Sequence, residues 1–191
     1  MAQGPVHKTM RDLVRRLECE DIDYSVIGGM ALVLHGYERL TVDVDLLMTR
    51  EGLAKFVERL VGRGYMPAFP AAKKHFRDVE TGVKIEIITT GEYPGDGKPK
   101  PVSFPDPSRV SKIADGIKVI ALATLIELKL ASGLSAEHRV KDIADVQQLI
   151  ETLNLSRAFQ FKLDQSVRDE YDRLWEATRR AREERIGPDQ E

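Results

Sequence analysis

The stretch Leu40-Thr-Val-Asp-Val-Asp-Leu-Leu-Met48 decides how this sequence is interpreted, together with Val26-Ile-Gly-Gly-Met-Ala-Leu-Val-Leu34 just upstream. In the first stretch charged and apolar residues alternate, a pattern typical of a half-buried strand. Because strand side chains alternate between faces, Asp43 and Asp45 are expected on one face together with Leu47. The other face is predicted to carry four apolar side chains, namely Val42, Val44, Leu46 and Met48.

The two carboxylates are expected roughly 6 to 7 Å apart on their face, where like charges repel. A divalent cation such as Mg²⁺ removes this repulsion, because hard cations bind carboxylate oxygens and keep coordination sites open for phosphate. Upstream, a short strand that ends at Gly28-Gly29 and leads into a helix offers backbone N–H groups to a phosphate. A tight turn without a ligand is the alternative for the glycines alone. The two motifs together predict a nucleotide-handling enzyme.

Composition limits the classes of protein to be considered. The chain has 191 residues, of which 42% are hydrophobic and 31% charged, as expected for a globular domain with a real core. Its formal net charge of −2 provides no overall positive field that would attract nucleic acid. Cys19 is the only cysteine, which excludes an intrachain disulfide and a cysteine-built zinc site. We find no signal peptide and no apolar run long enough for a membrane span, and therefore expect a cytoplasmic protein.

The periodicity of apolar residues predicts an α+β fold with a mixed sheet, flanking helices and a C-terminal helical segment. Strands are predicted at 24–27, 39–48, 74–79, 83–89 and 116–120, and helices at 7–20, 30–35, 51–63, 122–132, 139–153 and 163–186. A long connector, rich in Gly, Pro, Asp and Lys, spans residues 91–107. We expect two regions: an α/β core at 1–120 and a helical region at 121–191 that packs on it.

Glu86 is the candidate third carboxylate. In Val83-Lys-Ile-Glu-Ile87 the alternation places Glu86 opposite the apolar face. If this strand pairs beside the Asp43 strand, Glu86 can reach the same metal cluster. An ordinary solvent-facing glutamate is the alternative, and Asp78 on the preceding strand is a weaker candidate for the role.

Two blocks of this sequence resemble the DNA polymerase β-type nucleotidyltransferase superfamily, in particular its small bacterial abortive-infection toxins and antibiotic nucleotidyltransferases. The first block is Gly28-Gly29-x-Ala31, His35-Gly36 and Arg39-x-Thr41-x-Asp43-x-Asp45. The second is Lys129-Leu-Ala-Ser132 with Arg139-x-Lys141-Asp142-x-x-Asp145, which alone is less specific. Together they cover roughly residues 24 to 150.

The resemblance implies two Mg²⁺ ions, or Mn²⁺ in their place, and a nucleoside triphosphate (NTP) as the substrate. It implies that Asp43, Asp45 and Glu86 are catalytic and bind the metal. The residues implied in nucleotide binding are Gly28, Gly29, Arg39, Thr41 and Lys129, with Lys141 and Asp142 supporting them. Two departures from the superfamily matter: Gly29 stands where serine is frequent, and Glu86 stands where aspartate is common.

Several of these residues also have purely structural interpretations. Lys129 could be a surface lysine, and Arg39 could pair with Asp43 or another nearby acid. Lys141 and Asp145 could form a weak surface pair. His35, in an apolar helix, fits a hydrogen-bonded core histidine better than a ligand.

The leading hypothesis is an active nucleotidyltransferase whose acceptor is a small molecule, a tRNA end or a protein hydroxyl. The alternative is a non-catalytic binding module with the same fold, for example in a toxin–antitoxin pair with an antitoxin partner. A glycosyltransferase, which also uses an Asp-x-Asp motif, ranks third because Gly28-Gly29 has no role there.

Overall fold

The computed structural model describes residues 4–186, which form two compact units. The first unit comprises residues 4–92 and 104–125, and the second comprises 93–103 and 126–186. The chain crosses between the units after residue 92, after residue 103 and within helix α5 (Leu122–Ser135).

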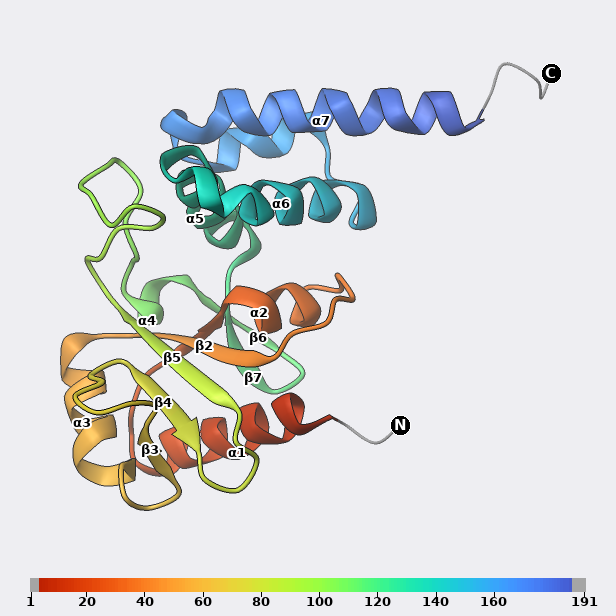
Figure 1. Cartoon of the computed structure of the whole chain (residues 1–191). Coiled ribbons are helices and arrows are strands. Elements are labelled where there is room, and N and C mark those ends of the chain that lie inside the picture. Colours follow the sequence, from red (N-terminus) through yellow and green to blue (C-terminus); the bar gives the residue numbers. More distant parts are fainter. Residues whose placement is uncertain (1–3, 187–191) are drawn as a thin grey trace. The chain divides into compact units, whose positions relative to one another are not determined.

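A seven-stranded mixed sheet forms the centre of the first unit (Figure 1), as the sequence predicts. Its order is β3-β4-β5-β2-β1-β7-β6. The pairs β1–β7 and β2–β5 are parallel, and the other neighbours are antiparallel. The strands are β1 (Ser25–Ile27), β2 (Asp43–Met48), β3 (Tyr65–Pro67), β4 (His75–Asp78), β5 (Lys84–Thr89), β6 (Ser111–Ala114) and β7 (Ile117–Ile120).

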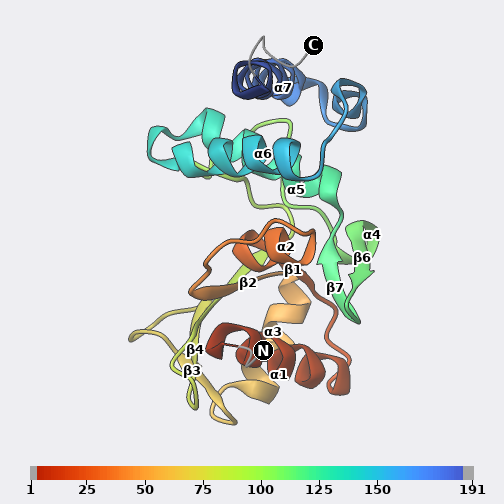
Figure 2. The same cartoon turned by 90° about the vertical axis from the view of Figure 1, so that its right-hand side faces the viewer.

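Helices α1 (Pro5–Cys19) and α3 (Arg50–Leu60) cover one face of this sheet (Figure 2). Phe56 of α3 packs on Phe76 of β4, with ring centroids 4.8 Å apart. Thr9 of α1 donates a hydrogen bond to Asp78 of the same strand at 2.9 Å. Val44, Leu46 and Met48 of β2, with Ile85 and Ile87 of β5, are buried on this face, so it holds the core of the unit.

Helix α2 (Gly28–Leu34) lies on the other side of the strands in both views. After α2, the predicted strand 39–48 proves too long at its start: residues 39–42 are a loop, and β2 begins only at Asp43. Leu40 and Val42 precede it and are 88% and 70% exposed, so Val42 does not share the apolar face with Val44. The Thr41 hydroxyl donates to the backbone oxygen of Asp43 at 3.3 Å. Such a local side-chain bond favours a turn over a strand ladder.

Three short elements of the first unit are absent from the sequence prediction: β3, β6 and helix α4 (Pro107–Val110). Strand β3 is an edge strand, where Pro67 is tolerated because no neighbour needs its missing N–H. Strand β6 is mostly exposed and turns back onto β7 through Asp115-Gly116. Both turn residues have positive φ, 51° and 74°, as a tight hairpin requires.

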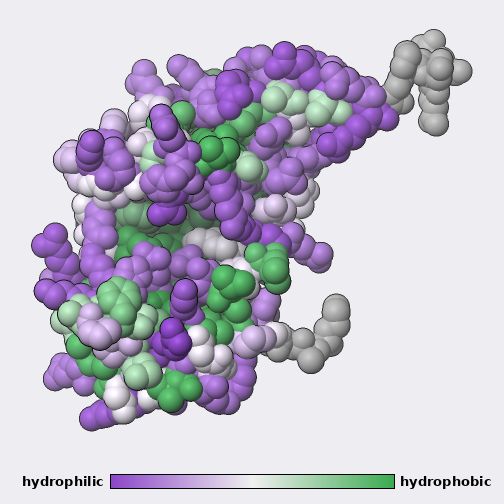
Figure 3. All heavy atoms as spheres, viewed as in Figure 1, coloured by the Kyte–Doolittle hydropathy of each residue, from purple (hydrophilic) through white to green (hydrophobic). Residues whose placement is uncertain are grey.

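The second unit is helical. It contains most of α5, the short 3₁₀ helices η1 (Glu137–Arg139) and η2 (Arg157–Lys162), α6 (Val140–Thr152) and α7 (Gln165–Ile186). Buried side chains of α6 and α7, among them Val146, Leu149, Tyr171 and Leu174, form its core. The surface of α7 that is visible in Figure 3 is largely hydrophilic. Within residues 4–186, no helix has both the length and the apolar character that a membrane crossing requires.

The predicted connector at 91–107 divides between the units. Its two ends are joined in the first unit, where Gly91 donates to Phe104 and Phe104 donates back to Glu92, both at 2.8 Å. The intervening residues 93–103 belong to the second unit. There Lys100 donates to the hydroxyl of Ser135 at 3.0 Å. The connector is therefore a closed loop with defined partners.

Candidate functional site

The turn between β1 and α2 lies directly against the side chain of Asp45. Gly28 adopts φ +62°, a left-handed conformation that favours glycine. A Cβ atom at this position would lie 1.9 Å from Oδ2 of Asp45, far inside van der Waals contact. Only glycine therefore allows the turn and the carboxylate to occupy their positions together.

Gly29 has the same relation to Thr41. A Cβ at Gly29 would lie 2.6 Å from the hydroxyl oxygen of Thr41. That hydroxyl also lies 3.4 Å from Oδ1 of Asp43, a long hydrogen bond. The glycine pair and the Thr-x-Asp-x-Asp segment therefore pack against each other residue by residue.

The carboxylates of β2 and β5 point to the face of the sheet opposite α1 and α3. Asp43 and Asp45 are half-buried, and Glu86 is exposed. Strand β5 pairs in parallel with β2, so that Glu86 stands directly opposite Asp45, and Lys84 opposite Asp43. Residues opposite each other on neighbouring strands project from the same face, so the structure brings Glu86 beside Asp45.

His75 is a neighbour of this site that the sequence prediction missed. It stands opposite Glu86 in the antiparallel pair β4–β5, so His75, Glu86 and Asp45 form one row across three strands. The His75 ring also contacts the exposed ring of Phe69, with centroids 5.8 Å apart. In the sequence, polar His75 beside apolar Phe76 indicates that His75 lies on the face opposite the core. Only the strand register shows that it stands opposite Glu86.

The carboxylates of Asp43 and Asp45 fit a magnesium ion whose remaining ligands come from a bound substrate and water. Within residues 4–186 no three His, Cys, Asp or Glu side chains converge closely enough to enclose a metal ion by themselves. Mg²⁺ in nucleotide-dependent enzymes usually needs only one or two carboxylates, because phosphate oxygens and water complete its octahedron. Asp43 and Asp45, on one face and beside the glycine turn, match that requirement.

Arg39 lies in the loop between α2 and β2 and is half-buried. Two other candidates in this unit have structural roles. His35 is the C-cap residue of α2; its Nε2 lies 2.7 Å from the backbone oxygen of Ile120, so it is hydrogen-bonded as expected, but it is half-buried and not part of the core. Asp78 is buried on the core face, where Thr9 and the backbone N–H of Glu80 donate to it, so it does not belong to the carboxylate row.

The remaining predicted residues lie in the second unit. Lys129 of α5 is buried and donates to Asp142 and Asp145 of α6, at 2.8 Å each. Ser132 donates to the second oxygen of Asp142 at 2.7 Å. Neither the surface position considered for Lys129 nor that for Asp145 is correct, because both side chains are at most 10% exposed. Lys141 is exposed on the same helix.

Charge and burial oppose each other at Asp142. Burial alone would raise the pKa of its carboxyl group, but the Lys129 ammonium and the hydrogen bonds from Lys129 and Ser132 outweigh burial. The pKa of Asp142 is therefore held below its ordinary value, and the group is ionised at neutral pH. The cluster is a charged network that ties α5 to α6.

Comparison with known proteins agrees with this geometry. No family model matches the sequence, and no curated protein matches it either. Among solved structures, ANT(2")-Ia in complex with adenylyl-2"-tobramycin is similar with a TM-score of 0.55 and 11% identity, over 92% of this chain and 98% of that one. An antigenic nucleotidyltransferase-like protein from Paracoccidioides brasiliensis is similar with a TM-score of 0.54 and 16% identity, over 92% of each chain. JHP933 from Helicobacter pylori is similar with a TM-score of 0.50 and 15% identity, over 95% of this chain and 93% of that one.

Identities this low identify a fold and leave activity open. The likeness to these structures extends over 92% of this chain, so it concerns the fold as a whole. This chain has a nucleotidyltransferase fold.

Proposed function

We propose that this protein is a Mg²⁺-dependent nucleotidyltransferase, which moves a nucleoside monophosphate from an NTP to an acceptor hydroxyl and releases pyrophosphate. The observation that supports it most is the apposition of Gly28 to Asp45 and of Gly29 to Thr41. A turn that only connects a strand to a helix does not require a carboxylate packed against its backbone. A turn that positions phosphates beside a metal-binding carboxylate does.

In the proposed reaction, the acceptor oxygen forms a bond to the α-phosphorus, and the bond from that phosphorus to the bridging oxygen breaks. Pyrophosphate leaves with the bonding electron pair, and the hydroxyl proton passes to Glu86, which stands opposite Asp45. Asp43 and Asp45 hold Mg²⁺, or Mn²⁺ in its place. When bound, the metal polarises phosphate oxygens and offsets their charge.

Within the first unit, nucleotide binding is assigned to the glycine pair, Arg39 and Thr41, and the expectation that Lys129 also contacts the nucleotide stays a prediction from the sequence. The Lys129 ammonium is held between two carboxylates, so Asp142 is proposed to orient it. We propose that exposed Lys141 supports the same helix. The acceptor is a small molecule, a tRNA end or a protein, and the expected location is the cytoplasm.

The direct test is transfer of label from each of the four α-labelled NTPs to fractions of a cell lysate in the presence of Mg²⁺. We expect one NTP to label an acceptor, and Asp45→Asn to abolish labelling while its circular dichroism spectrum is unchanged. Glu58→Gln, which removes an exposed acid from α3, is the matched control and should label like the wild type. Equal labelling by wild type and Asp45→Asn, or none by either, contradicts the proposal.

The second candidate is a non-catalytic binding module with the same fold, for example one that assembles with an antitoxin. The exposed position of Glu86, and the lack of a three-carboxylate cluster among the described residues, favour it. It predicts that nucleotide binding depends on Asp43 while no label is transferred. Binding with transfer supports the enzyme.

A further inference from the structure

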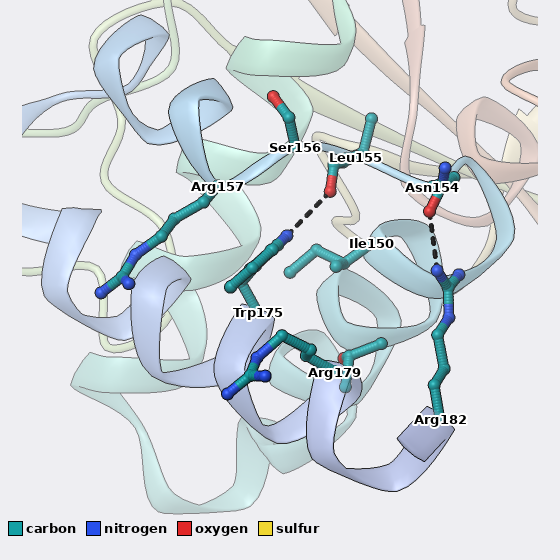
Figure 4. Close-up of a pocket in the computed structure, with 9 residues that line it drawn as sticks. Ile150, Asn154, Leu155, Ser156, Arg157, Trp175, Arg179 and Arg182 are labelled. Atoms are coloured by element: carbon teal, nitrogen blue, oxygen red, sulfur yellow. Dashed lines mark hydrogen bonds between the residues drawn. The ribbon is translucent and has the colours of Figure 1, made fainter. Parts of the chain in front are cut away.

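A small cavity in the second unit shares no residue with the glycine–carboxylate site. It lies where α6 ends, between residues 154–157 and one side of α7 (Figure 4). Its volume is about 260 Å³. Trp175, Arg179 and Arg182 reach it from α7, and Arg157 reaches it from the start of η2. All of these residues belong to one unit, so the cavity depends on that unit alone.

The cavity has a flat, fixed aromatic wall. The indole N–H of Trp175 donates to the backbone oxygen of Leu155 at 3.0 Å, which sets the orientation of the ring. Ile150 adds an apolar surface, and the hydroxyl of Thr178 is bonded back to Leu174 at 2.9 Å. This wall suits a planar, apolar body.

Three backbone oxygens beside the cavity already have donors. The backbone oxygen of Ile150 accepts from Leu155 at 3.1 Å, and that of Leu155 accepts from Trp175. The backbone oxygen of Ser156 accepts from the hydroxyl of Tyr171 at 3.1 Å. A ligand therefore finds few free acceptors on this wall, and a group that brings only donors gains little here.

Donors remain in excess, and they are positively charged. Arg182 donates to two neutral oxygens, the side chain of Asn154 at 2.6 Å and the backbone of Glu151, which leaves its positive charge uncompensated by these bonds. Arg179 pairs with Glu183 at 2.6 Å, but both side chains are more than half exposed, and such pairs are weak. Arg157 lies over the Trp175 ring, 5.7 Å from its centroid, but it pairs with both Asp172 and Glu176, so the available charge is that of Arg179 and Arg182.

None of the described residues that line the cavity is acidic. Guanidinium groups bind carboxylate and phosphate through paired N–H donors. We propose that this cavity binds a small planar anion: an aromatic ring that lies on Trp175 and carries a phosphate or carboxylate held by Arg179 and Arg182. The volume is just below that of typical pockets for drug-sized ligands, so it suits one ring system with one anionic group.

Trp175 is the only tryptophan of the chain, so intrinsic tryptophan fluorescence reports on this cavity directly. The probes are AMP and benzoate, with adenosine as the uncharged counterpart of AMP. We expect a saturable change with AMP, with benzoate or with both, and binding of adenosine at least tenfold weaker than AMP. A response to AMP alone identifies a nucleotide as the source of the anion, and a response to benzoate alone identifies an aromatic acid.

Arg179→Gln should weaken binding at least tenfold, because it removes a charged donor whose present partner is a solvent-exposed glutamate. Arg180→Gln removes the same charge from the next residue, which is exposed and does not line the cavity, and should bind like the wild type. Asp45→Asn should also leave the titration unchanged, which separates this site from the proposed catalytic one. Equal melting temperatures of the two arginine variants establish that both are folded.

Three results would overturn the inference. One is the absence of a saturable change with either anion up to about 10 mM. Another is equal affinity of Arg179→Gln and the wild type. The third is adenosine binding as tightly as AMP, which would mean that the ring is recognised without its charge.

Discussion

At the scale of single residues, the contact of Gly28 with Asp45 allows two effects of glycine to be separated. Gly28→Ala forces a Cβ into the space of a carboxylate oxygen 1.9 Å away and also strains a backbone at φ +62°. We expect a loss of about 1–2 kcal/mol in the free energy of unfolding from the backbone conformation. We further expect label transfer to fall at least 100-fold, because Asp45 must move.

Gly82→Ala is the matched control for this prediction. Gly82 has nearly the same backbone conformation, φ +73°, but a Cβ there meets nothing within 4 Å. Urea unfolding should show a similar loss for both variants, whereas only Gly28→Ala should lose transfer. If both retain full activity, the position of Asp45 beside the turn does not matter for function.

Glu86 provides a second test at this scale. As the proposed proton acceptor, Glu86→Gln should lower the transfer rate about 10²- to 10⁴-fold, because the amide cannot accept the proton. Lys84→Gln is the matched control, since Lys84 is exposed on the same strand and the same face. Single-turnover rates measure both variants. A rate for Glu86→Gln close to that of the wild type assigns the proton to another group, and His75, opposite Glu86, is then the first to test.

At the scale of elements, the link between α5 and α6 depends on one buried lysine. Lys129→Met leaves Asp142 and Asp145 facing each other with no cation between them, at a cost of about 3–5 kcal/mol in unfolding free energy. Lys141→Met, on the exposed side of α6, should change stability by less than about 0.5 kcal/mol. Urea denaturation followed by Trp175 fluorescence measures both. Similar stabilities would show that the network is dispensable.

The same network predicts a pH dependence. The pKa of Asp142 is lowered in the folded state, so its contribution to stability is present above the ordinary carboxyl pKa and is lost as pH falls through the folded value. We expect the melting temperature to fall between about pH 5 and pH 3, and to fall less in Asp142→Asn. An identical acid profile for that variant would assign the loss to other carboxylates, among them buried Asp78, whose pKa is also lowered.

The elements also show what could be predicted from the sequence and what could not. Long helices and the strands β2, β4 and β5 follow from apolar periodicity, because burial of one face determines them. The exposed strand β6 has no such pattern, although its Asp115-Gly116 turn was a usable hairpin signal. The start of β2 was predicted too early. Val42 continues the apolar alternation of the strand in the sequence, but it lies exposed in a loop.

For the candidate site, the sequence predicts candidate residues but not their neighbours. The placement of Asp43 and Asp45 on one face follows from strand alternation, which is a local property. The pairing of Glu86 with Asp45 and the row that adds His75 depend on strand order and register. Register is set by long-range packing. The sequence could therefore say only that Glu86 reaches the metal cluster if its strand pairs beside the Asp43 strand.

At the scale of the whole molecule, bound nucleotide should raise the melting temperature, because a ligand that binds only the folded chain stabilises it by mass action. At 100 times the dissociation constant this amounts to about 2.7 kcal/mol. For a chain of this length, the corresponding increase in melting temperature is about 5–10 °C. Differential scanning fluorimetry with ATP or another NTP and Mg²⁺ measures it.

Asp43→Asn should abolish this increase in melting temperature without changing the fold. Glu58→Gln removes one negative charge from the exposed side of α3 and should keep the full increase, so the effect cannot be attributed to net charge. Nucleotide without Mg²⁺ should give a much smaller increase in the wild type, because phosphate and carboxylate then repel each other. An increase that is equal with and without Mg²⁺, and equal in Asp43→Asn, would mean that the nucleotide binds away from the carboxylates of β2.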